Sequence, residues 1–492
     1  MTRLRTYQDA IVALNSLQSN AQAIEKSRKE RGSNVSKNIP WMERLLHIME
    51  IKLEDLDTLN IIHVSGTKGK GSTCAFTESL LRNLGYSTGF FSSPHLVAVR
   101  ERIRLNGKPI SEAMFSSYFW PVFDRLSQHC PPEEMPPYFK FLTILSFYIF
   151  LREKVDVAVV EVGIGGAYDS TNVIRNPVVC GVSSLGFDHM TLLGQTLTEI
   201  AWHKAGIFKP ACPAVTVPQP PEAMDVLTKQ ADKIGAPLFI APPLDCYPTE
   251  SGAPLKLGID GEVQSLNASL ALQLCRMWIS RRGKQIGMGV PVDEPPALPA
   301  FGITSTLATA LETCRWPGRF QRLRRSSVEF YLDGAHTKES VRHCADWYQK
   351  TRSKEPSVRR ILLFNSTADR KPEDLLRPLV ECSFDYALFC PNIIGKTVTA
   401  TSDVANLTVN ADQQLERCNV QEKIWRDLAD STGAEGGRDC STLCFASVTN
   451  AFRWIDEMER QNGVEVEVLV TGSLHLVGAM LTLLDPTLEE AL

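Results

Sequence analysis

The sequence predicts an α/β fold made of two domains, each built on a mostly parallel sheet. From residue 60 onward, short β-branched runs alternate with segments of helical periodicity, which is the pattern of strands and crossover helices. A segment rich in Pro and Gly, residues 283–304, interrupts the alternation before it begins again. At 492 residues and 43% hydrophobic, the chain is long enough for two or three domains. We expect a first domain over residues 1–309, with 283–304 as a linker or insertion, and a second over 310–492.

The expected elements follow in chain order. Residues 6–50 are predicted to be helical, with Ala10, Ile11, Leu14 and Leu17 on one face and a charged stretch at 25–31. Strands of the first domain are expected at 60–64, 155–162, 178–183 and 214–217, a buried helix at 139–151, and a helix at 267–281 that closes this domain. Strands of the second domain are expected at 328–332, 360–364, 386–389 and 466–470. No internal repeat of fixed period is visible.

Composition excludes several classes of protein. The 52 basic and 56 acidic residues give a net charge of −4, whereas sequence-independent nucleic-acid binders carry a basic face. No apolar run approaches the ~20 residues of a membrane helix. The 13 cysteines form no Cys-x-x-Cys pair, which favours reduced thiols in the cytosol, with Cys440 and Cys444 as small buried residues. The N-terminus is basic for only a few residues, unlike a mitochondrial presequence. We therefore expect a cytoplasmic protein. Mitochondria are a second expected location, because an alternative start could add a presequence.

A glycine-rich turn at residues 66–72 follows the first expected strand and precedes a helical pattern at 73–84. This order forms an anion cradle, because backbone N–H groups at a helix N-terminus can converge on phosphate oxygens. Gly69, Lys70 and Gly71 would supply the backbone amides. Lys70 would also supply an ammonium group, and Ser72 a hydroxyl group. The strict P-loop pattern is not met, since Val64 replaces its first Gly and Gly71 separates Lys70 from Ser72. An ordinary glycine turn before a helix is the alternative.

One carboxylate, Glu161, is embedded near the end of the buried run at 155–162. A buried carboxylate must be paired or bound to a cation, and the carboxyl ends of strands are where open α/β sheets bind ligands. The alternative is a carboxylate satisfied by backbone N–H groups of residues 163–166. The next strand runs into Asp188 and His189, which we expect at a neighbouring strand end and which favour a metal site. His189 would be an uncommon ligand for Mg²⁺, and a structural histidine is its alternative.

Two further segments are candidates for the same site. Ser92 and Ser93 supply hydroxyl groups at a third strand end. Lys204 is expected on a short helix just past the His189 loop, where a solvated lysine is the default interpretation. A lysine beside a metal carboxylate can instead lose its proton and become available for covalent modification.

Seven motifs occur in an order and at spacings that resemble the folylpolyglutamate synthases, a family of the Mur-ligase superfamily of ATP-dependent amide-forming enzymes. They are Gly66-Thr-Lys-Gly-Lys-Gly-Ser72, Ser92-Ser-Pro-His-Leu96, Glu161-Val-Gly-Ile-Gly-Gly166, Asp188-His189, Lys204-Ala-Gly-Ile207, Pro317-Gly-Arg319 and Asp333-Gly-Ala-His336. The likeness runs from about residue 40 to 484, and the superfamily loop Gly-Thr-x-Gly-Lys-x-Ser/Thr accounts for the departure from the strict P-loop. The resemblance implies a P-loop Mur-ligase-type ATPase domain followed by a smaller Rossmann-like domain. The segments at residues 39–42 and 99–104 resemble segments found in the eukaryotic-type members of this family.

The resemblance also implies residue roles. Gly69, Lys70, Gly71 and Ser72 would hold the ATP phosphates. Ser93 and Glu161 would bind one Mg²⁺, Glu161 and His189 a second, and Lys204 matches a lysine that is carbamylated in some members. Nucleotide and phosphate would also be contacted by Asn267, Arg319, Asp333 and His336. One departure is Val263, which stands where the family often has a His and which makes Asn267 the least secure of these assignments.

The activity implied by the resemblance is ATP-dependent addition of L-glutamate to the γ-carboxylate of tetrahydrofolate or a folylpolyglutamate through an acyl phosphate. Cofactors would be ATP and two Mg²⁺ ions, with a monovalent cation as a further candidate. The catalytic candidates are Lys70, Lys204 and His336, the last as a base for the glutamate amine oriented by Asp333, with a nucleotide or interface contact as the alternative. We expect a monomer with small-molecule substrates, without nucleic acid or a membrane span.

Three other functions are considered. A dihydrofolate synthase, or a bifunctional enzyme, would share the ATP-binding motifs and add the first glutamate to dihydropteroate. A P-loop NTPase without ligase activity leaves the carboxylate-rich strand ends and the Lys204 helix unexplained. A dinucleotide-dependent oxidoreductase is disfavoured, because residues 163–166 lack the full Gly-x-Gly-x-x-Gly spacing.

Overall fold

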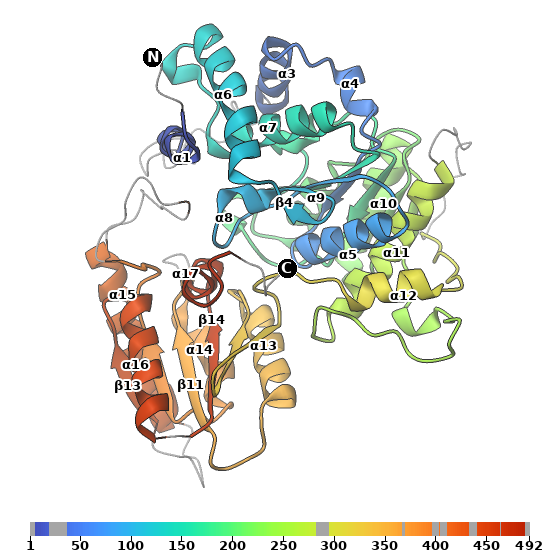
Figure 1. Cartoon of the computed structure of the whole chain (residues 1–492). Coiled ribbons are helices and arrows are strands. Elements are labelled where there is room, and N and C mark those ends of the chain that lie inside the picture. Colours follow the sequence, from blue (N-terminus) through green and yellow to red (C-terminus); the bar gives the residue numbers. More distant parts are fainter. Residues whose placement is uncertain are drawn as a thin grey trace. The chain divides into compact units, whose positions relative to one another are not determined.

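The structure is a computed structural model that describes residues 5–18, 37–281, 295–366, 370–395, 403, 411–431, 440–462 and 464–487. Its contacts divide the chain into two compact units (Figure 1). The first comprises Met1–Pro94, Arg100–Gly258 and Gln264–Cys314, and the second comprises His95–Val99, Ile259–Val263 and Arg315–Leu492. Two short segments of the earlier chain thus fold with the second unit. Residues 19–36 of the helical region expected at 6–50, which include the charged stretch at 25–31, and residues 283–294 of the Pro/Gly-rich segment lie outside the described residues.

The sheet of the first unit has its phosphate-loop strand at the centre. Its strands are β1 (Ile62–Ser65), β2 (Thr88–Phe91), β3 (Ile103–Leu105), β4 (Lys108–Pro109), β5 (Val157–Glu161), β6 (Val179–Val182), β7 (Ala214–Thr216) and β8 (Leu238–Ile240). Their order is β4-β3-β2-β5-β1-β6-β7-β8, parallel from β2 to β8, with β3 and β4 antiparallel. One expectation is corrected: β5 and β6 are not neighbours, because β1 pairs with both. Val64 therefore lies opposite Glu161 on one side and Gly181 on the other.

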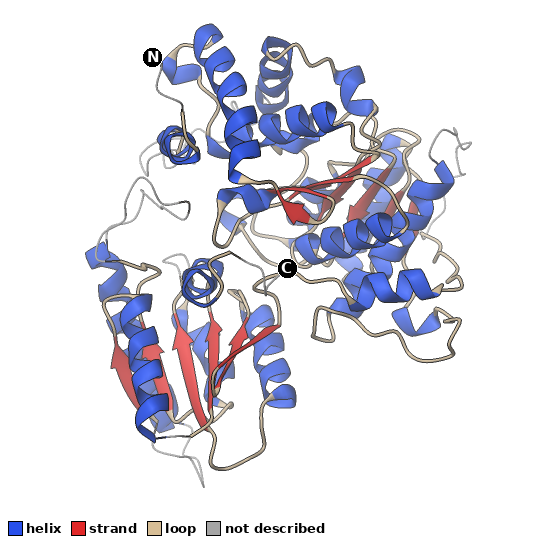
Figure 2. Cartoon of the chain, viewed as in Figure 1, coloured by secondary structure: helices blue, strands red, loops and turns tan. Residues whose placement is uncertain are grey.

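Helices pack on this sheet (Figure 2). They are α1 (Tyr7–Ser16), α3 (Asn38–Ile48), α4 (Leu53–Asp57), α5 (Lys70–Asn83), α6 (Glu112–His129), α7 (Tyr138–Glu153), α8 (Met190–Leu193), α9 (Leu197–Ala205), α10 (Pro221–Ile234), α11 (Gln264–Arg281) and α12 (Ser305–Glu312), with 3₁₀ turns at Val99–Arg102, Pro132–Glu134, Ser170–Val173 and Leu244–Cys246. α5 packs against α11 and α12, while α9 and α10 cover a core that includes Val162, Cys180 and Val182. The buried helix expected at 139–151 is α7. None of the described helices combines the length and apolar composition of a membrane span.

The second unit is a six-stranded sheet with helices on both faces. It contains β9 (Gln321–Arg325), β10 (Val328–Leu332), β11 (Arg359–Phe364), β12 (Tyr386–Phe389), β13 (Ser441–Cys444) and β14 (Val466–Thr471), and α13 (Lys338–Thr351), α14 (Pro372–Val380), α15 (Ala411–Ser431), α16 (Val448–Asn462) and α17 (Leu474–Leu484). The order is β13-β12-β11-β14-β10-β9, and only β9 runs antiparallel among these strands. α16 and α17 cover one face, and α13, α14 and α15 the other. The sequence missed β9 and β13, the two edge strands, because edges do not need a continuous apolar run.

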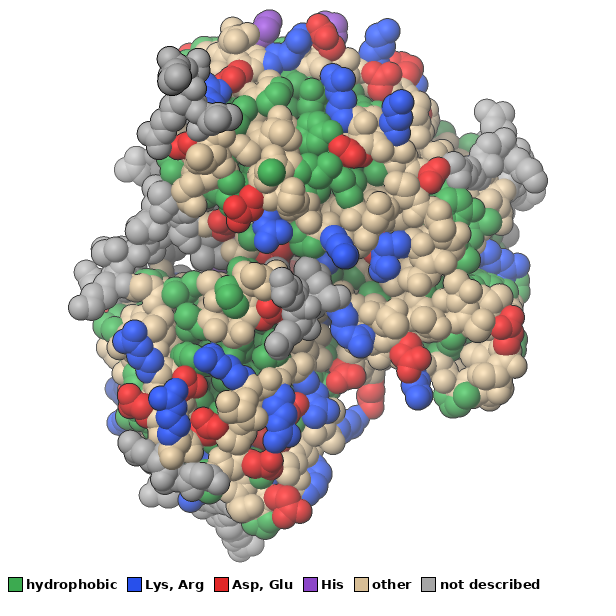
Figure 3. Space-filling view, viewed as in Figure 1, with side chains coloured by type: hydrophobic (Ala, Val, Ile, Leu, Met, Phe, Trp, Pro, Cys, Tyr) green, Lys and Arg blue, Asp and Glu red, His purple; other side chains and the backbone are tan. Residues whose placement is uncertain are grey.

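Two further features of the fold are the state of the cysteines and the distribution of surface charge. All 13 cysteines are free thiols. Cys440 and Cys444 were expected to be buried, but both are partly exposed; Cys444 ends the edge strand β13 and Cys440 precedes it. On the face shown in Figure 3, basic and acidic side chains are interspersed. Several surface charges form ion pairs, as in the 2.6 Å contact between Arg342 and Glu381.

Candidate functional site

The turn between β1 and α5 is shaped as a phosphate loop. Gly66 and Gly69 have φ angles of 145° and 84°, which residues with a side chain rarely adopt. A Cβ at Gly66 would lie 1.9 Å from the Ser183 hydroxyl oxygen, and one at Gly69 would lie 2.1 Å from Asn267 Oδ1. Backbone conformation and space therefore both exclude a side chain at these two positions. α5 begins at Lys70, three residues before the expected start, so the amides of residues 70–72 lie at the positive end of the helix.

Asn267 lies directly against this loop, although its assignment was the least secure. It sits on α11, is buried, and receives the Thr73 hydroxyl on Oδ1 at 3.4 Å. Its Nδ2 donates to Gln264 Oε1 at 2.9 Å, and Gln264 is also buried. The sequence had not singled out Gln264, which directly follows Val263. Val263 packs against the core of the second unit.

Glu161 joins the ends of two neighbouring strands. It is the last residue of β5, only 4% exposed, and β2 runs parallel beside it. The N–H of Ser93, two residues past β2, donates to Glu161 Oε2 at 3.2 Å. Oε1 lies 3.9 Å from Lys70 Nζ. The structure thus brings together three residues that the sequence had assigned to phosphate and metal binding.

The glycine-rich segment after Glu161 donates a backbone hydrogen bond to Asp169, whereas the alternative considered from the sequence was Glu161 as the acceptor. The N–H of Ile164 donates to Asp169 Oδ2 at 3.0 Å, and the N–H and hydroxyl of Thr171 donate to Oδ1 at 3.0 and 2.6 Å. Burial raises the pKa of Asp169, and these hydrogen bonds oppose the rise. Thr171 Oγ1 also lies 2.9 Å from His63 Nε2, and burial lowers the pKa of His63 to about 3. The sequence missed Asp169; its signal was an Asp followed two residues later by Thr, the spacing of an Asx turn.

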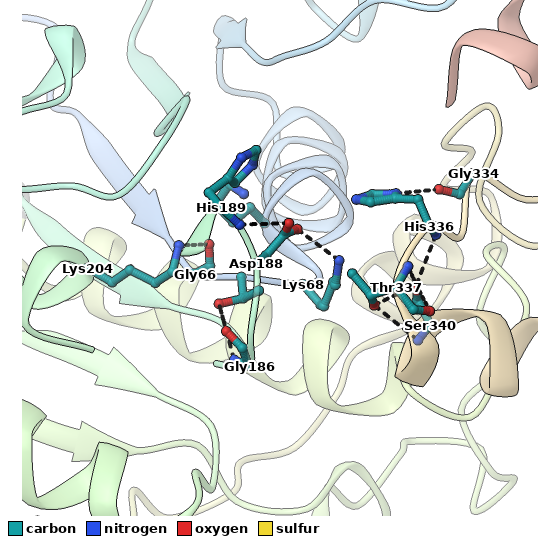
Figure 4. A network of polar contacts seen from close by, with 12 residues as sticks. Gly66, Lys68, Gly186, Asp188, His189, Lys204, Gly334, His336, Thr337 and Ser340 are labelled. Carbon is teal, nitrogen blue, oxygen red and sulfur yellow. Dashed lines mark hydrogen bonds and ion pairs between the residues drawn. The ribbon is translucent and has the colours of Figure 1, made fainter. Parts of the chain in front are cut away.

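Lys204 is positioned by a short helix with a defined start. Thr196 and Glu199 form a capping box that begins α9, and Lys204 lies in its last turn, where a cation is favoured. Lys204 is 3% exposed, and its Nζ donates to the Gly66 carbonyl at 2.7 Å (Figure 4). Burial lowers the pKa of Lys204 well below its usual value, and the positive charges of Lys70 and Lys68 lower it further.

Asp188 and His189 follow β6 on the other side of the phosphate loop. Lys68 Nζ lies 3.1 Å from Asp188 Oδ2, and the N–H of His189 donates to Asp188 Oδ1 at 2.9 Å (Figure 4). His189 has a left-handed backbone, with a φ of 50°, and precedes α8. Within the described ranges, no group of three or more His, Cys, Asp or Glu residues could hold a metal ion. The expected metal-binding set also draws on Ser93 and Lys204, which are donors of other types.

In the second unit, Asp333 joins two loops at one edge of the sheet. It follows β10, and β9 pairs antiparallel with β10, so the segment before β9 reaches the same edge. Asp333 Oδ2 accepts the N–H of Phe320, and Oδ1 accepts the N–H of Ala335, both at 2.9 Å. The buried carboxylate therefore fixes the loops that carry Arg319 and His336.

His336 is oriented by a backbone carbonyl. Its Nδ1 lies 2.7 Å from the Gly334 carbonyl (Figure 4). A carbonyl can only accept, so Nδ1 carries the proton and the neutral ring has its lone pair on Nε2. The expectation that Asp333 orients the ring stays a prediction, and the contact at Nδ1 is made by the Gly334 carbonyl. Arg319 donates to the Gly318 carbonyl at 3.1 Å, and a Cβ at Gly334 would lie 2.9 Å from the Arg319 guanidinium.

Comparison with known proteins identifies the family. No protein-family model matches the chain. The human mitochondrial folylpolyglutamate synthase is 45% identical and covers 98% of this chain and 92% of its own length. A folylpolyglutamate synthase of Arabidopsis thaliana is 38% identical and covers 98% and 87%. The Mycobacterium tuberculosis folylpolyglutamate synthase structure with ADP shares the fold, with a TM-score of 0.70 at 23% identity and coverage of 96% and 99%. At these identities over nearly the full length, the chain belongs to the folylpolyglutamate synthase family.

Proposed function

We propose that the chain uses ATP to add L-glutamate to the γ-carboxylate of tetrahydrofolate or a folylpolyglutamate. Family membership supports the activity, and one observation in the structure supports its chemistry. Lys70 and the Ser93 amide meet the buried Glu161 carboxylate immediately beside a phosphate loop. That arrangement suits transfer of a phosphoryl group, in which charge on several oxygens must be balanced at one place.

The first chemical step makes the carboxylate a better acyl donor. A γ-carboxylate oxygen attacks the γ-phosphorus of ATP, the bond from this phosphorus to the ADP oxygen breaks, and an acyl phosphate forms. Gly69, Lys70, Gly71 and Ser72 hold the phosphates, and the Lys70 charge stabilises the transferring oxygens. The glutamate nitrogen then attacks the acyl carbon, the C–N bond forms, and inorganic phosphate leaves while the amine gives up a proton.

The donors around Glu161 fit Mg²⁺, which prefers carboxylate and other oxygen ligands. Glu161 is buried, and its Oε1 lies 3.9 Å from Lys70 Nζ, so the structure places a carboxylate next to a positive charge at this point. We propose that Ser93 and Glu161 hold one Mg²⁺ ion, and that Glu161, His189 and a carbamylated Lys204 hold a second. We also propose that the protein binds a monovalent cation. When bound, Mg²⁺ offsets the negative charge of the phosphates.

Carbamylation of Lys204 is supported by its environment. Burial and the charges of Lys68 and Lys70 favour the neutral amine. A neutral amine can attack carbon dioxide, forming an N–C bond and releasing one proton, and the product is a carboxylate. Growth with ¹³C-labelled bicarbonate and carbon-13 NMR test this: a carbamate signal that Lys204→Arg abolishes supports it, and a spectrum unaffected by that substitution contradicts it.

Asn267 and the second-unit residues carry over from the family resemblance. We propose that Asn267, Arg319 and Asp333 serve nucleotide binding, Arg319 by contacting phosphate and Asp333 by fixing the loop before β9. We assign His336 as the base that accepts the proton of the glutamate amine, since its Nδ1 hydrogen bond leaves Nε2 as the basic nitrogen. Near-normal turnover of His336→Ala at saturating substrates would rule out that assignment.

A direct assay tests the activity. The enzyme is incubated with ATP, Mg²⁺, tetrahydrofolate and labelled glutamate, and the products are analysed by mass. Successive glutamyl additions are expected. Dihydropteroate offered in parallel distinguishes a dihydrofolate synthase or bifunctional enzyme, and ATP hydrolysis indifferent to folate and glutamate would indicate an NTPase without ligase activity.

Location and assembly are further proposals. We propose that the protein acts in mitochondria as well as the cytoplasm, supported by the mitochondrial name of the human relative. Fractionation of cells, followed by detection with an antibody against the protein, tests this location.

We also propose that the protein is a monomer that binds small molecules and no nucleic acid. Light scattering after size-exclusion chromatography measures its mass and tests the monomeric state.

A further inference from the structure

The phosphate loop is bonded along its first half to the loop that follows β6. The N–H groups of Thr67 and Lys68 both donate to the Ser184 carbonyl at 3.0 Å. The Thr67 hydroxyl donates to the Gly186 carbonyl at 3.1 Å and accepts the N–H of Gly186 at 3.2 Å. These backbone-based contacts fix the two loops to each other without any charged side chain.

An ion pair adds one more connection at the far end of this interface. Lys68 Nζ lies 3.1 Å from Asp188 Oδ2; the Lys68 side chain is 32% exposed and the Asp188 side chain 7%. The other carboxylate oxygen of Asp188 accepts the N–H of His189 at 2.9 Å, where the backbone has a φ of 50° (Figure 4). The same carboxylate therefore bridges a phosphate-loop ammonium and the strained backbone of His189.

Three lysines gather at this site, and each has a different partner. Lys70 faces Glu161, and Lys204 donates to the Gly66 carbonyl. Lys68 instead faces the carboxylate that precedes His189. Its contact is with protein, one residue away from a proposed metal ligand, which places it where outer residues orient the residues that bind a metal.

We propose that Lys68 is a positioning residue. It holds the Asp188 carboxylate, and through it the His189 backbone, in a fixed position next to the phosphate loop. Its role in turnover rests on the proposed function. Lys68 does not touch the reacting atoms in this account. Because the Thr67 and Lys68 amides still bind Ser184 without the ammonium, loss of the charge should leave the loop folded while loosening His189.

The test compares Lys68→Met, Asp188→Asn and the double variant. We expect Lys68→Met to raise the dissociation constant of Mg²⁺ for the enzyme–ADP complex about tenfold, measured by calorimetric titration of Mg²⁺ alone, as for other residues that orient metal ligands. kcat should fall by about the same factor, with the KM for tetrahydrofolate changed less than twofold. Lys68→Arg should recover most of both losses. The double variant should be no worse than Asp188→Asn, since the two groups act as one unit.

A matched control is Lys229→Met, which removes the exposed 2.7 Å pair with Asp225 in the same unit and should change neither quantity. If Lys68→Met leaves Mg²⁺ affinity unchanged, the proposal is wrong. Additive losses in the double variant, with a raised KM for ATP, would also overturn it and assign Lys68 to direct substrate contact. The calorimetric result does not require turnover, so failure of glutamyl transfer in the wild-type enzyme would refute the proposed function separately.

Discussion

Replacing Glu161 by Gln removes one buried negative charge at the centre of the proposed site while preserving shape. The amide oxygen can still accept the Ser93 N–H, whereas the charge interaction with Lys70, 3.9 Å away, is lost. Two unit charges at that distance interact by about 4 kcal/mol at an effective dielectric constant near 20. Lys70 retains partial solvent access, with 17% of its side chain exposed. The net loss should therefore lie between the ~0–1 kcal/mol of exposed pairs and the ~3–5 kcal/mol of buried ones, at about 2 kcal/mol.

The expected effect on activity is larger than that on stability. Loss of one preorganised charged group typically lowers kcat by about 10²–10³-fold, and ADP formation measured against Mg²⁺ concentration should show this together with a weaker Mg²⁺ dependence. The Tm should fall by roughly 4 °C. Glu78→Gln is the matched control, because Glu78 is a buried carboxylate of the same unit paired with Arg82 at 3.0 Å. It should lower the Tm similarly but keep turnover. A Glu161→Gln enzyme with wild-type kcat and Mg²⁺ dependence would refute the reasoning.

Three further predictions concern other residues. Arg319→Ala should lose ADP formation with an unchanged Tm, and an unchanged rate of ADP formation would contradict its assignment to phosphate. Gly69→Ala should abolish ATP binding in equilibrium titration, because a Cβ would lie 2.1 Å from Asn267 Oδ1 at a φ of 84°; wild-type affinity would contradict the proposed loop geometry. The pKa of His63 is about 3 in the folded state against 6.5 ordinarily, so the unfolded state binds more protons and stability falls as pH drops from about 6.5 toward 3. The loss attributable to His63 at pH 5 is about 2 kcal/mol, and His63→Leu should show a shallower decline of Tm between pH 7 and 5; equal slopes would contradict burial of a neutral imidazole.

Local patterns in the sequence predicted β1, β5, β6 and β7 of the first sheet and β10, β11, β12 and β14 of the second, but not β3, β4 or β8 and not the strand order. Strands with continuous apolar runs, such as β10 (Val328–Leu332), were predicted with their observed bounds. The edge strands β9 and β13 were missed, because β9 reads Gln-Arg-Leu-Arg-Arg and buries only one of its side chains. The position of β1 between β5 and β6 follows from long-range pairing, which no local pattern reports.

The candidate site shows the same division. Motif spacing predicted Lys70, Ser93 and Glu161, and strand pairing in the structure brings them together. The spacing of Asp169 and Thr171 indicates only a local turn, and the N–H of Ile164 reaches the same carboxylate only in the folded loop, so the sequence did not predict this network. The contact of His336 Nδ1 with the Gly334 carbonyl likewise depends on loop geometry that spacing does not contain.

The acyl phosphate is the central claim, and an isotope measurement tests it most directly. Tetrahydrofolate labelled with ¹⁸O in both γ-carboxylate oxygens is incubated with the enzyme, ATP, Mg²⁺ and glutamate, and the released phosphate is analysed by mass. In an acyl phosphate, one carboxylate oxygen bridges carbon and phosphorus and leaves with the phosphate when the amide forms. The account predicts one ¹⁸O atom in each phosphate released. Phosphate without ¹⁸O, formed alongside glutamylated product, would contradict it.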